Sequence, residues 1–250
     1  MKKYTPFAFA LLTLLTGCDP DPKPEIVNLE VAIQPVFGAS NTPVAFESQP
    51  FAMGTDTVKF TRTDMILSDF ALLDAQGQRV EIRNEYGFVS LPNKNTWTFP
   101  SVIAPGNYTG FAFSIGLDST NNHGDPTVWS GTHALNPSVN NLHWGWTGGY
   151  IFAATEGYYQ KEGMEAPWLY HIALDENKMD IHIMTSLDLT YNMRLNLDLD
   201  LEGLFKALHD LSPVEDGDFT HSTFDNGLAN KLAENLRNSF RFSSLEKQTP

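Results

Sequence analysis

The sequence is poor in cysteine, in positive charge and in long apolar runs. Cys18 is its single cysteine, which excludes an internal disulfide and a cluster of thiolate ligands. Lysine and arginine together number 16 against 30 acidic residues, so the formal charge is −14. A surface this acidic repels nucleic acid and anionic lipid headgroups, and it suits a cationic or metal partner.

Signature motifs of common enzymes are missing as well. The chain has no Gly-x-Ser-x-Gly, no His-Glu-x-x-His and no phosphate-binding glycine loop. Its acids are scattered, so no pair can be assigned to glycoside hydrolysis. These absences favour a binding protein, without catalytic residues, over an enzyme.

The longest apolar run near the N-terminus, Pro6–Leu15, has about half of the roughly twenty residues that a membrane-spanning helix needs. Lys2 and Lys3 precede it, and the tetrad Leu-Thr-Gly-Cys that ends at Cys18 resembles a bacterial lipobox. The resemblance implies a signal peptide over residues 1–17 and a lipid-modified Cys18 on the periplasmic side of a membrane. Asp19 is similar to the signal that retains lipoproteins at the inner membrane of enteric bacteria.

A proline-rich tether follows, over residues 18–25, and its composition predicts a stiff, extended spacer. Loss of residues 1–17 would remove two lysines and change the formal charge from −14 to −16. Residues 26–250 are expected to form a single domain.

Alternation of apolar and polar residues predicts many short strands in that domain. They are Ile26–Phe37, Thr57–Phe60, Asp64–Leu73, Arg79–Ile82, Phe88–Leu91, Thr96–Phe99, Tyr108–Leu117, Trp168–Leu174, Met179–Leu187 and Leu187–Leu201. Two apolar stripes at helical spacing predict a short helix (Leu201, Leu204, Phe205, Leu208) and a C-terminal helix capped by Asp225 or Asn226 (Leu228, Leu232, Leu236, Phe240). The fold class is therefore mainly β, an antiparallel β-sandwich with a short helix and a C-terminal helix.

Aromatic and histidine residues are concentrated in the middle of the chain. Trp144 and Trp146 lie two residues apart in the stretch Asn141–Gly157, so an extended backbone points both to one face and His143 to the other. The long irregular segment before this stretch carries His123, Trp129 and His133, and loops of that length are often functional. The stretch is either an aromatic core strand or the wall of a ligand or metal pocket.

Five of the seven histidines fall within Asn122–Met184, together with four of the five tryptophans. Imidazole is a ligand for zinc, copper, iron and nickel. His171 shares a strand face with apolar residues, and a buried imidazole requires a partner. His182 shares its face with acids and is expected to be exposed. For each histidine, a hydrogen-bonded structural role is the alternative to a ligand role.

Several motifs resemble, in order and spacing, the MbnP-like family of periplasmic copper-binding proteins, which is paired with a MauG-like di-haem enzyme. They are Met65–Leu73, Ile115–Asp118, Asn122–Pro126, His143–Phe152, Tyr170–Leu174 and Leu232–Phe240. The Trp-x-Trp-x-x-Gly-Tyr core is the most specific of them. The family's methanobactin-linked branch has a four-cysteine motif that this chain lacks.

The resemblance implies a β-sandwich that binds copper through histidines and through a kynurenine that the di-haem partner makes from a tryptophan. Carried over by motif, His123 and His171 are the first ligand candidates and His143 is the third. His133 and His182 are further candidates. The tryptophans that could be oxidised are Trp144, Trp146 and Trp129.

Two other functions remain open for such a sandwich. Exposed aromatics on an acidic domain are also typical of a glycan-binding or adhesion module that holds no metal. A copper oxidase would need an open coordination position, which a sequence does not show.

Overall fold

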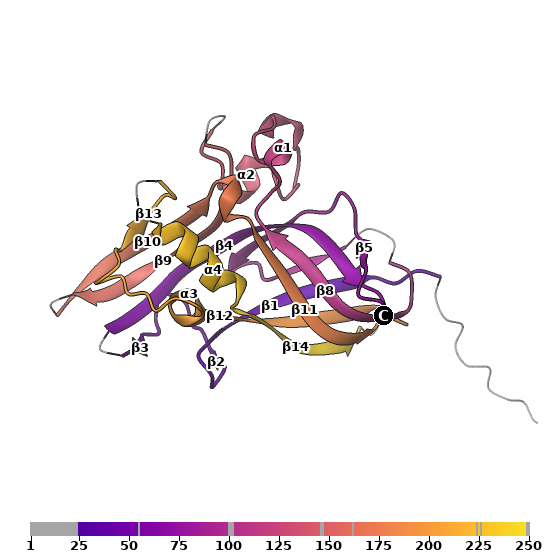
Figure 1. Cartoon of the computed structure of the whole chain (residues 1–250), viewed down its shortest axis with the longest axis horizontal. Helices are drawn as coiled ribbons and strands as arrows, with labels where there is room; N and C mark the ends of the chain where they lie inside the picture. The colour runs from indigo at the N-terminus through magenta and orange to yellow at the C-terminus, as the bar shows by residue number, and fades with distance from the viewer. Residues whose placement is uncertain are drawn as a thin grey trace, which may run out of the picture.

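The structure is a computed structural model that describes residues 25–54, 56–99, 103–145, 148–161, 163–223, 225 and 227–248. The predicted signal peptide, Cys18, nearly all of the tether and Trp146 lie outside the described residues. The described chain folds into two β-sheets with a few short helices (Figure 1). Among the described residues, no helix combines the length and the apolar character needed to cross a membrane.

The smaller sheet has five strands in the order β14-β12-β1-β2, with β7 also paired to β1. They are β1 (Leu29–Phe37), β2 (Thr42–Pro43), β7 (Thr96–Thr98), β12 (Met193–Asp200) and β14 (Phe240–Lys247). Leu195, Leu197 and Leu199 of β12 are fully buried while the residues between them are partly exposed. This is the alternation expected of a sheet with one face toward the core.

The larger sheet has nine strands, and its main path is β11-β8-β4-β9-β10-β13, with β3, β5 and β6 also paired to β4. They are β3 (Phe51–Met53), β4 (Asp56–Leu73), β5 (Arg79–Glu81), β6 (Gly87–Leu91), β8 (Asn107–Ile115), β9 (Ile151–Lys161), β10 (Met164–Ala173), β11 (Met179–Asp188) and β13 (Phe219–Thr220).

Four α-helices and two 3-10 turns complete the described part of the chain. They are α1 (Ser119–Asn122), η1 (Pro126–Val128), α2 (Pro137–Asn140), η2 (Asp175–Asn177), α3 (Gly203–Lys206) and α4 (Leu228–Arg237). α1 and α2 lie together at one end of the larger sheet, and α4 packs on β10 and β11 (Figure 1).

An aromatic core joins these layers. The ring of Phe113 in β8 meets Phe240 in β14 at 5.4 Å between centroids, which links the two sheets. Phe205 of α3 packs on Trp168 of β10 at 5.6 Å and on Phe60 of β4 at 6.2 Å. All five side chains are buried.

The mainly β sandwich with a short helix and a C-terminal helix is thus confirmed. The pairing is not purely antiparallel, because β1 runs parallel to β12 and β10 runs parallel to β13. The second parallel pair matters for the site described below.

Several element boundaries differ from the sequence prediction, and three of the differences change the path of the backbone. The two strands expected over residues 57–73 are one strand, β4, which continues through irregular pairing near Thr61 and Asp69. The alternating run Leu187–Leu201 is interrupted by a turn at 189–192, where the hydroxyl and the amide of Thr190 donate to Asp188. The residues before the turn belong to β11 of the larger sheet, and those after it, up to Asp200, belong to β12 of the smaller sheet. Phe240 begins β14 because α4 ends at Arg237.

Candidate functional site

Four neighbouring strands of the larger sheet place polar side chains on one face. Arg62 of β4 lies opposite Glu156 of β9, and Asp64 lies opposite Ala154, which in turn lies opposite His171 of β10. Residues directly opposite each other, and residues two apart on one strand, point to the same side of a sheet. Arg62, Asp64, Glu156 and His171 therefore share a face across three strands.

The fourth strand, β13, adds a second histidine beside His171. Because β13 pairs with β10 in parallel, with Leu169 opposite Phe219 and Tyr170 opposite Thr220, His221 follows on at the level of His171. The Ser222 hydroxyl fixes this end of the strand, since it donates to the carbonyl of His171 (2.9 Å) and accepts from the amide of Ala173 (2.8 Å).

The two imidazoles stack face to face. Their ring centroids are 4.9 Å apart and their planes differ by 6°. Trp144 packs against both, at 5.1 Å from His221 and 6.2 Å from His171. We call His171 and His221 the imidazole pair, and the pair together with Trp144 the His–Trp cluster. His171 has 13% of its side chain exposed and Trp144 is 38% exposed, so the cluster opens to solvent on the tryptophan side.

A short hairpin aims Trp144 at the pair. The amide of Trp144 donates to the carbonyl of Gly149 (3.0 Å), and the amide of Gly149 donates to the carbonyl of Gly145 (3.1 Å). Gly149 has φ +67°, and a Cβ there would lie 2.5 Å from Oδ1 of the buried Asn122, so only glycine fits. Asn122 also accepts from the amide of Tyr150 (2.8 Å), which fixes the hairpin to α1.

A chain of polar contacts lies beneath His171. Its Nε2 is 2.9 Å from Oε1 of Glu156, and the same oxygen accepts from Nη1 of Arg62 at 3.0 Å. Nε of Arg62 donates to Oδ2 of the buried Asp64 at 2.5 Å. The hydrogen bond with His171 lowers the pKa of Glu156, with help from the charge of Arg62 and against the effect of burial. Burial, and then the charge of His171, lower the pKa of His221, which favours its neutral form.

The pair fits a metal in the chemistry of its donors. Nδ1 of His171 is buried without a hydrogen-bond partner, and such an atom is costly unless it binds something. Metal–imidazole bonds are about 2.0 Å long, so two nitrogens that share an ion lie within roughly 4 Å of each other. The ring centroids are 4.9 Å apart and the planes are nearly parallel, so one ring would have to turn for both lone pairs to point at a shared ion. Among the described residues, however, no three histidine, cysteine, aspartate or glutamate side chains are grouped as one ion would require.

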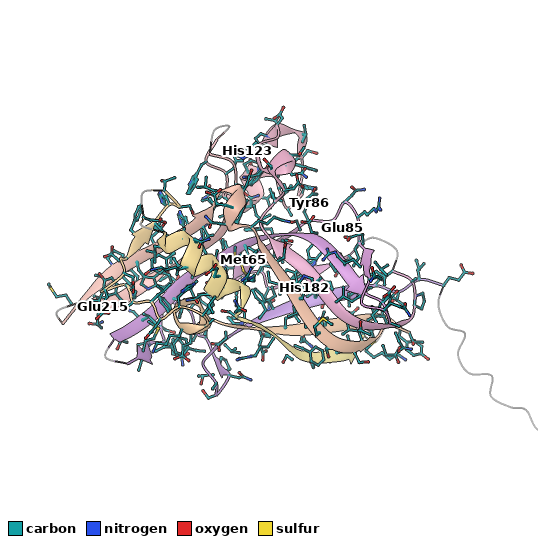
Figure 2. The ribbon with its side chains drawn as sticks, viewed as in Figure 1. Met65, Glu85, Tyr86, His123, His182 and Glu215 are labelled. Atoms are coloured by element: carbon teal, nitrogen blue, oxygen red, sulfur yellow. The ribbon has the colours of Figure 1, made fainter. Side chains whose placement is uncertain are left out.

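The other predicted histidine ligands lie apart from the pair. His123 ends α1, has 42% of its side chain exposed, and its Nε2 contacts Oδ1 of Asp175 at 3.2 Å. His182 is exposed on β11, as expected (Figure 2). The motif that placed His123 first among the ligand candidates therefore lies in contact with a carboxylate of η2.

His133 and His143 each use Nδ1 for a local hydrogen bond. Nδ1 of His133 accepts from the amide of Leu135 (3.1 Å), and Nδ1 of His143 accepts from the amide of Gly145 (3.0 Å). The ring of His133 stacks on Trp129 at 4.2 Å, and the ring of His143 meets Tyr150 edge-on at 4.6 Å. Burial lowers the pKa of both histidines. Trp129 and Tyr86 thus form a separate aromatic cluster with His133.

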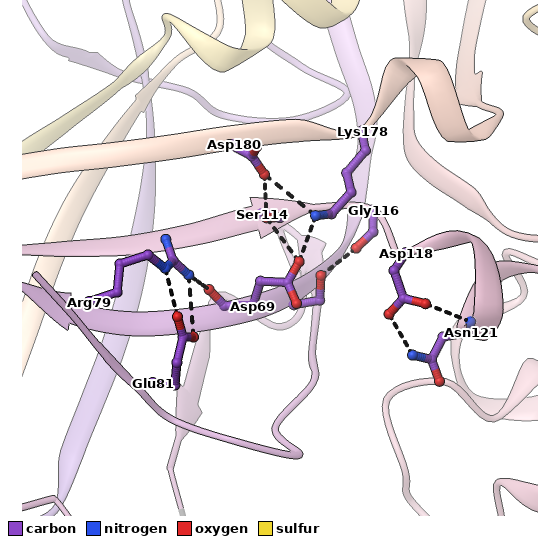
Figure 3. A network of polar contacts seen from close by, with 10 residues as sticks. Asp69, Arg79, Glu81, Ser114, Gly116, Asp118, Asn121, Lys178 and Asp180 are labelled. Carbon is purple, nitrogen blue, oxygen red and sulfur yellow. Dashed lines mark hydrogen bonds and ion pairs between the residues drawn. The ribbon is translucent and has the colours of Figure 1, made fainter.

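Two acids of the larger sheet, Asp69 and Asp180, share one lysine. Lys178 contacts Asp69 at 2.6 Å and Asp180 at 3.5 Å, and Ser114 donates to Asp180 at 2.7 Å (Figure 3). Arg79 donates to the carbonyl of Asp69 at 2.7 Å. Hydrogen bonds and the charge of Lys178 outweigh burial and lower the pKa of Asp180.

His221 is the site residue that sequence reasoning missed. It follows an acidic, loop-like segment, and β13 has only two residues, which is too short to show any alternation. The sequence feature that could have indicated a strand beside His221 is the dipeptide Phe219-Thr220, because both residue types favour strands.

The family model described as MbnP matches residues 27–222. The solved structure of MbnP from Methylosinus trichosporium superimposes with a TM-score of 0.52 at 19% sequence identity, covering 72% of this chain and 77% of that one. This likeness concerns the fold. No protein of curated function matches the sequence.

Proposed function

The chain belongs to the MbnP family, and from this premise we propose that it is a copper-binding protein whose ion is held by the His–Trp cluster. The observation that carries the proposal is the stacked imidazole pair beneath Trp144. Neutral imidazole nitrogens suit copper, and the acidic protein around them favours a cation.

Two histidines are few ligands for a copper ion, and this points to Trp144. An indole offers only an N–H donor. Oxidative cleavage of its C2–C3 bond adds two oxygen atoms, which two peroxide molecules supply while forming two waters. Hydrolysis then releases formate and leaves kynurenine, whose aniline nitrogen and carbonyl can both act as ligands. Trp144 is the described tryptophan in contact with the imidazole pair, so we assign it this role ahead of Trp129.

The partner in this proposal is a MauG-like di-haem enzyme that uses peroxide to oxidise Trp144. The exposed edge of Trp144 supports such access, because the ring is 38% exposed, and Phe219, which is 56% exposed, packs on His221 at 4.5 Å. The lipobox-like tetrad supports a lipid anchor at Cys18 on the periplasmic side, with Asp19 favouring the inner membrane.

The test is coexpression with the di-haem partner, followed by elemental analysis and peptide mass spectrometry. We expect copper together with a mass change on the Trp144 peptide equal to the loss of one carbon and the gain of one oxygen. His171→Asn, His221→Asn and Trp144→Phe should each lose most of the copper. His209→Asn and Trp129→Phe are the matched controls and should retain it. Unmodified tryptophans with no copper after coexpression would contradict the proposal.

A glycan-binding module is the second candidate, and the exposed rings of Trp144 and Phe219 favour it. Aromatic faces of this kind could pack on sugar rings with no metal present. Parallel thermal-shift titrations with copper and with a panel of oligosaccharides separate the two functions. Stabilisation by sugars alone, abolished by Phe219→Ala, would support the glycan function.

A further inference from the structure

Three side chains connect His171 to the interior of the sheet, and their order has a chemical consequence. Asp64 accepts from Nε of Arg62, and Nη1 of Arg62 donates to Oε1 of Glu156. That oxygen also contacts Nε2 of His171. Asp64 is 5% exposed. The series of contacts therefore begins at a buried carboxylate, that of Asp64, and ends at the ring of His171, which is a candidate ligand.

The two ring nitrogens of His171 are therefore not equivalent. An ionised carboxylate is an acceptor only, so the atom that faces Glu156 must donate. Nε2 thus carries the hydrogen, and in the neutral ring the lone pair is on Nδ1. Nδ1 is the nitrogen that is buried without a hydrogen-bond partner.

The two loop histidines have the same tautomer but an occupied lone pair. Nδ1 of His133 and Nδ1 of His143 each accept a backbone N–H at about the ideal distance. A metal would have to displace that bond or force the ring into its other tautomer. His171 differs because its lone pair competes with no such contact.

We propose that Glu156, held by Arg62, is a positioning residue that fixes His171 in the Nε2–H tautomer, so that copper bonds to Nδ1 of this ring. The proposal rests on the copper function and adds to it the ligating atom and the group that selects it. Carboxylates that accept the second N–H of a metal-bound imidazole orient the ring and raise its basicity.

Neighbouring backbone explains why this arrangement is rigid. β9 lies between β4 and β10, so Glu156 has a strand on each side and cannot turn away from both partners. Ala154, two residues before Glu156, is the small residue between Asp64 and His171. The side chain of Glu156 is 24% exposed, which shields its contacts from full solvation.

The first test needs no metal. Long-range proton–nitrogen NMR of the copper-free wild-type protein distinguishes the two tautomers, and His171→Gln assigns the signals by their loss. We expect Nε2 protonated and Nδ1 unprotonated. On addition of Cu(I), which is diamagnetic, the Nδ1 signal should shift while Nε2 keeps its hydrogen. A ring with its hydrogen on Nδ1 would overturn the proposal and leave copper binding untouched.

The second test uses two variants of one residue. Glu156→Ala removes the acceptor and should weaken copper binding by about 10–100-fold. Glu156→Gln keeps an amide oxygen for Arg62 and His171, so it should keep the tautomer and recover most of the affinity. Glu165→Gln is the control, because Glu165 pairs with Lys59 on the same face away from the imidazoles.

The outcomes separate a positioning role from other roles. If Glu156→Ala retains wild-type affinity and the Nε2–H tautomer, Glu156 does not position the ring. If Glu156→Gln binds as weakly as Glu156→Ala while its tautomer is unchanged, the carboxylate is itself a ligand, which also overturns the proposal. Loss of copper from His221→Asn with no shift of His171 signals in the wild type would place the ion on His221 alone.

Discussion

Asn235 is the side chain through which α4 holds α3. Its Nδ2 donates to the carbonyls of Leu204 (3.0 Å) and His209 (2.9 Å), and its Oδ1 accepts from the amides of Leu208 and His209 (both 2.7 Å). The side chain is fully buried, and these four bonds use its whole capacity. No other side chain of this size has two donors and two acceptors with which to form the same four hydrogen bonds.

We expect Asn235→Ala to lower the free energy of unfolding by about 2–4 kcal/mol, because it removes a buried side chain whose four hydrogen bonds go to two backbone amides and two backbone carbonyls. Urea denaturation followed by tryptophan fluorescence measures the change. Asn230→Ala is the matched control, since Asn230 is exposed on the same helix and should change stability by less than about 0.5 kcal/mol. Equal effects of the two substitutions would show that the network around Asn235 contributes nothing.

At the scale of residues, half of the imidazole pair was predictable. The strand around His171 shows its alternation over several residues, so its burial and its need for a partner follow from the sequence. His221 depends on a parallel pairing between segments about fifty residues apart, which local patterns do not encode. The ligand roles of His123 and His143 stay predictions, but their contacts with Asp175 and Tyr150 now give each a structural role.

Among the elements, β9 depends on one glycine for its place between β4 and β10. A Cβ on Gly157 would lie 1.8 Å from the carbonyl oxygen of Lys59 and 2.8 Å from the Trp168 ring. The carbonyl of Lys59 is backbone and cannot move aside as a flexible side chain can, so β4 and β9 would have to separate.

Gly157→Ala is therefore expected to destabilise the protein by about 3 kcal/mol or more. Gly106→Ala is the control, because the nearest atom to a Cβ there is 3.7 Å away, an ordinary contact. Its effect should stay within about 1 kcal/mol. Thermal and urea unfolding of the three proteins give the comparison, and a Gly157→Ala protein as stable as its control would mean that β9 is not held this closely.

Asp225 holds the start of α4 and the end of β13 together. Its carboxylate accepts from the amides of Gly227 and Ala229 (both 3.0 Å) and from the hydroxyl of Thr220. Burial raises the pKa of Asp225, but the hydrogen bonds from Thr220, Ala229 and Gly227 outweigh it, so the net pKa is lowered. The N-cap position itself is Gly227, so Asp225 is not the cap that the sequence predicted, although its carboxylate binds an amide of the first turn. The alternative, Asn226, lies outside the described residues.

A lowered pKa in the folded state gives a definite sign of pH dependence. The folded protein binds this proton less readily than the unfolded chain, so the stabilisation is complete above the ordinary carboxyl pKa of about 3.9. It is lost as the pH falls through the lower, folded value. Asp225→Ala should cost about 1–2 kcal/mol at pH 7, and the difference from wild type should shrink toward pH 3. A difference that stays constant between those pH values would mean that the charge of Asp225 is not involved.

Element types were easier to predict than element boundaries. Alternation identified most strands, yet it continued through the turn at 189–192, because turn residues can keep the period by chance. The apolar stripe of α4 included Phe240 for a similar reason, since this ring packs on Phe113 from a strand as well as it would from a helix. Periodicity reports which side chains are buried, and only tertiary packing decides where the backbone turns.

For the whole molecule, the fold class followed from the many short strands, whereas the arrangement of the sheets did not. Both parallel pairings, β1 with β12 and β10 with β13, join segments far apart in sequence. One of them builds the imidazole pair. Composition suggested a cation as partner, and the distribution of histidines suggested that the site lies in the middle of the chain. Neither predicted that Trp144 packs against His221.

Copper at the His–Trp cluster would connect three separate parts of the chain: the hairpin of Trp144, strand β10 and the end of β13. An ion that binds only the folded state stabilises it by about 2.7 kcal/mol when free copper is 100 times the Kd. The local effect should be larger than the global one where the connected segments are short and open readily. Those segments are residues 142–145, 148–150 and 219–222.

Hydrogen exchange of copper-free and copper-loaded protein measures this coupling. We expect added protection in the Trp144 hairpin and in residues 219–222. Within the part of the chain that the structure describes, the turn at 189–192 makes no hydrogen bond to the cluster and should exchange at an unchanged rate, which makes it an internal control. His221→Asn should abolish the added protection in both segments together, because its loss removes the bond that joins them. Protection that rises in the hairpin alone would place the ion on Trp144 and the loop histidines, outside the imidazole pair.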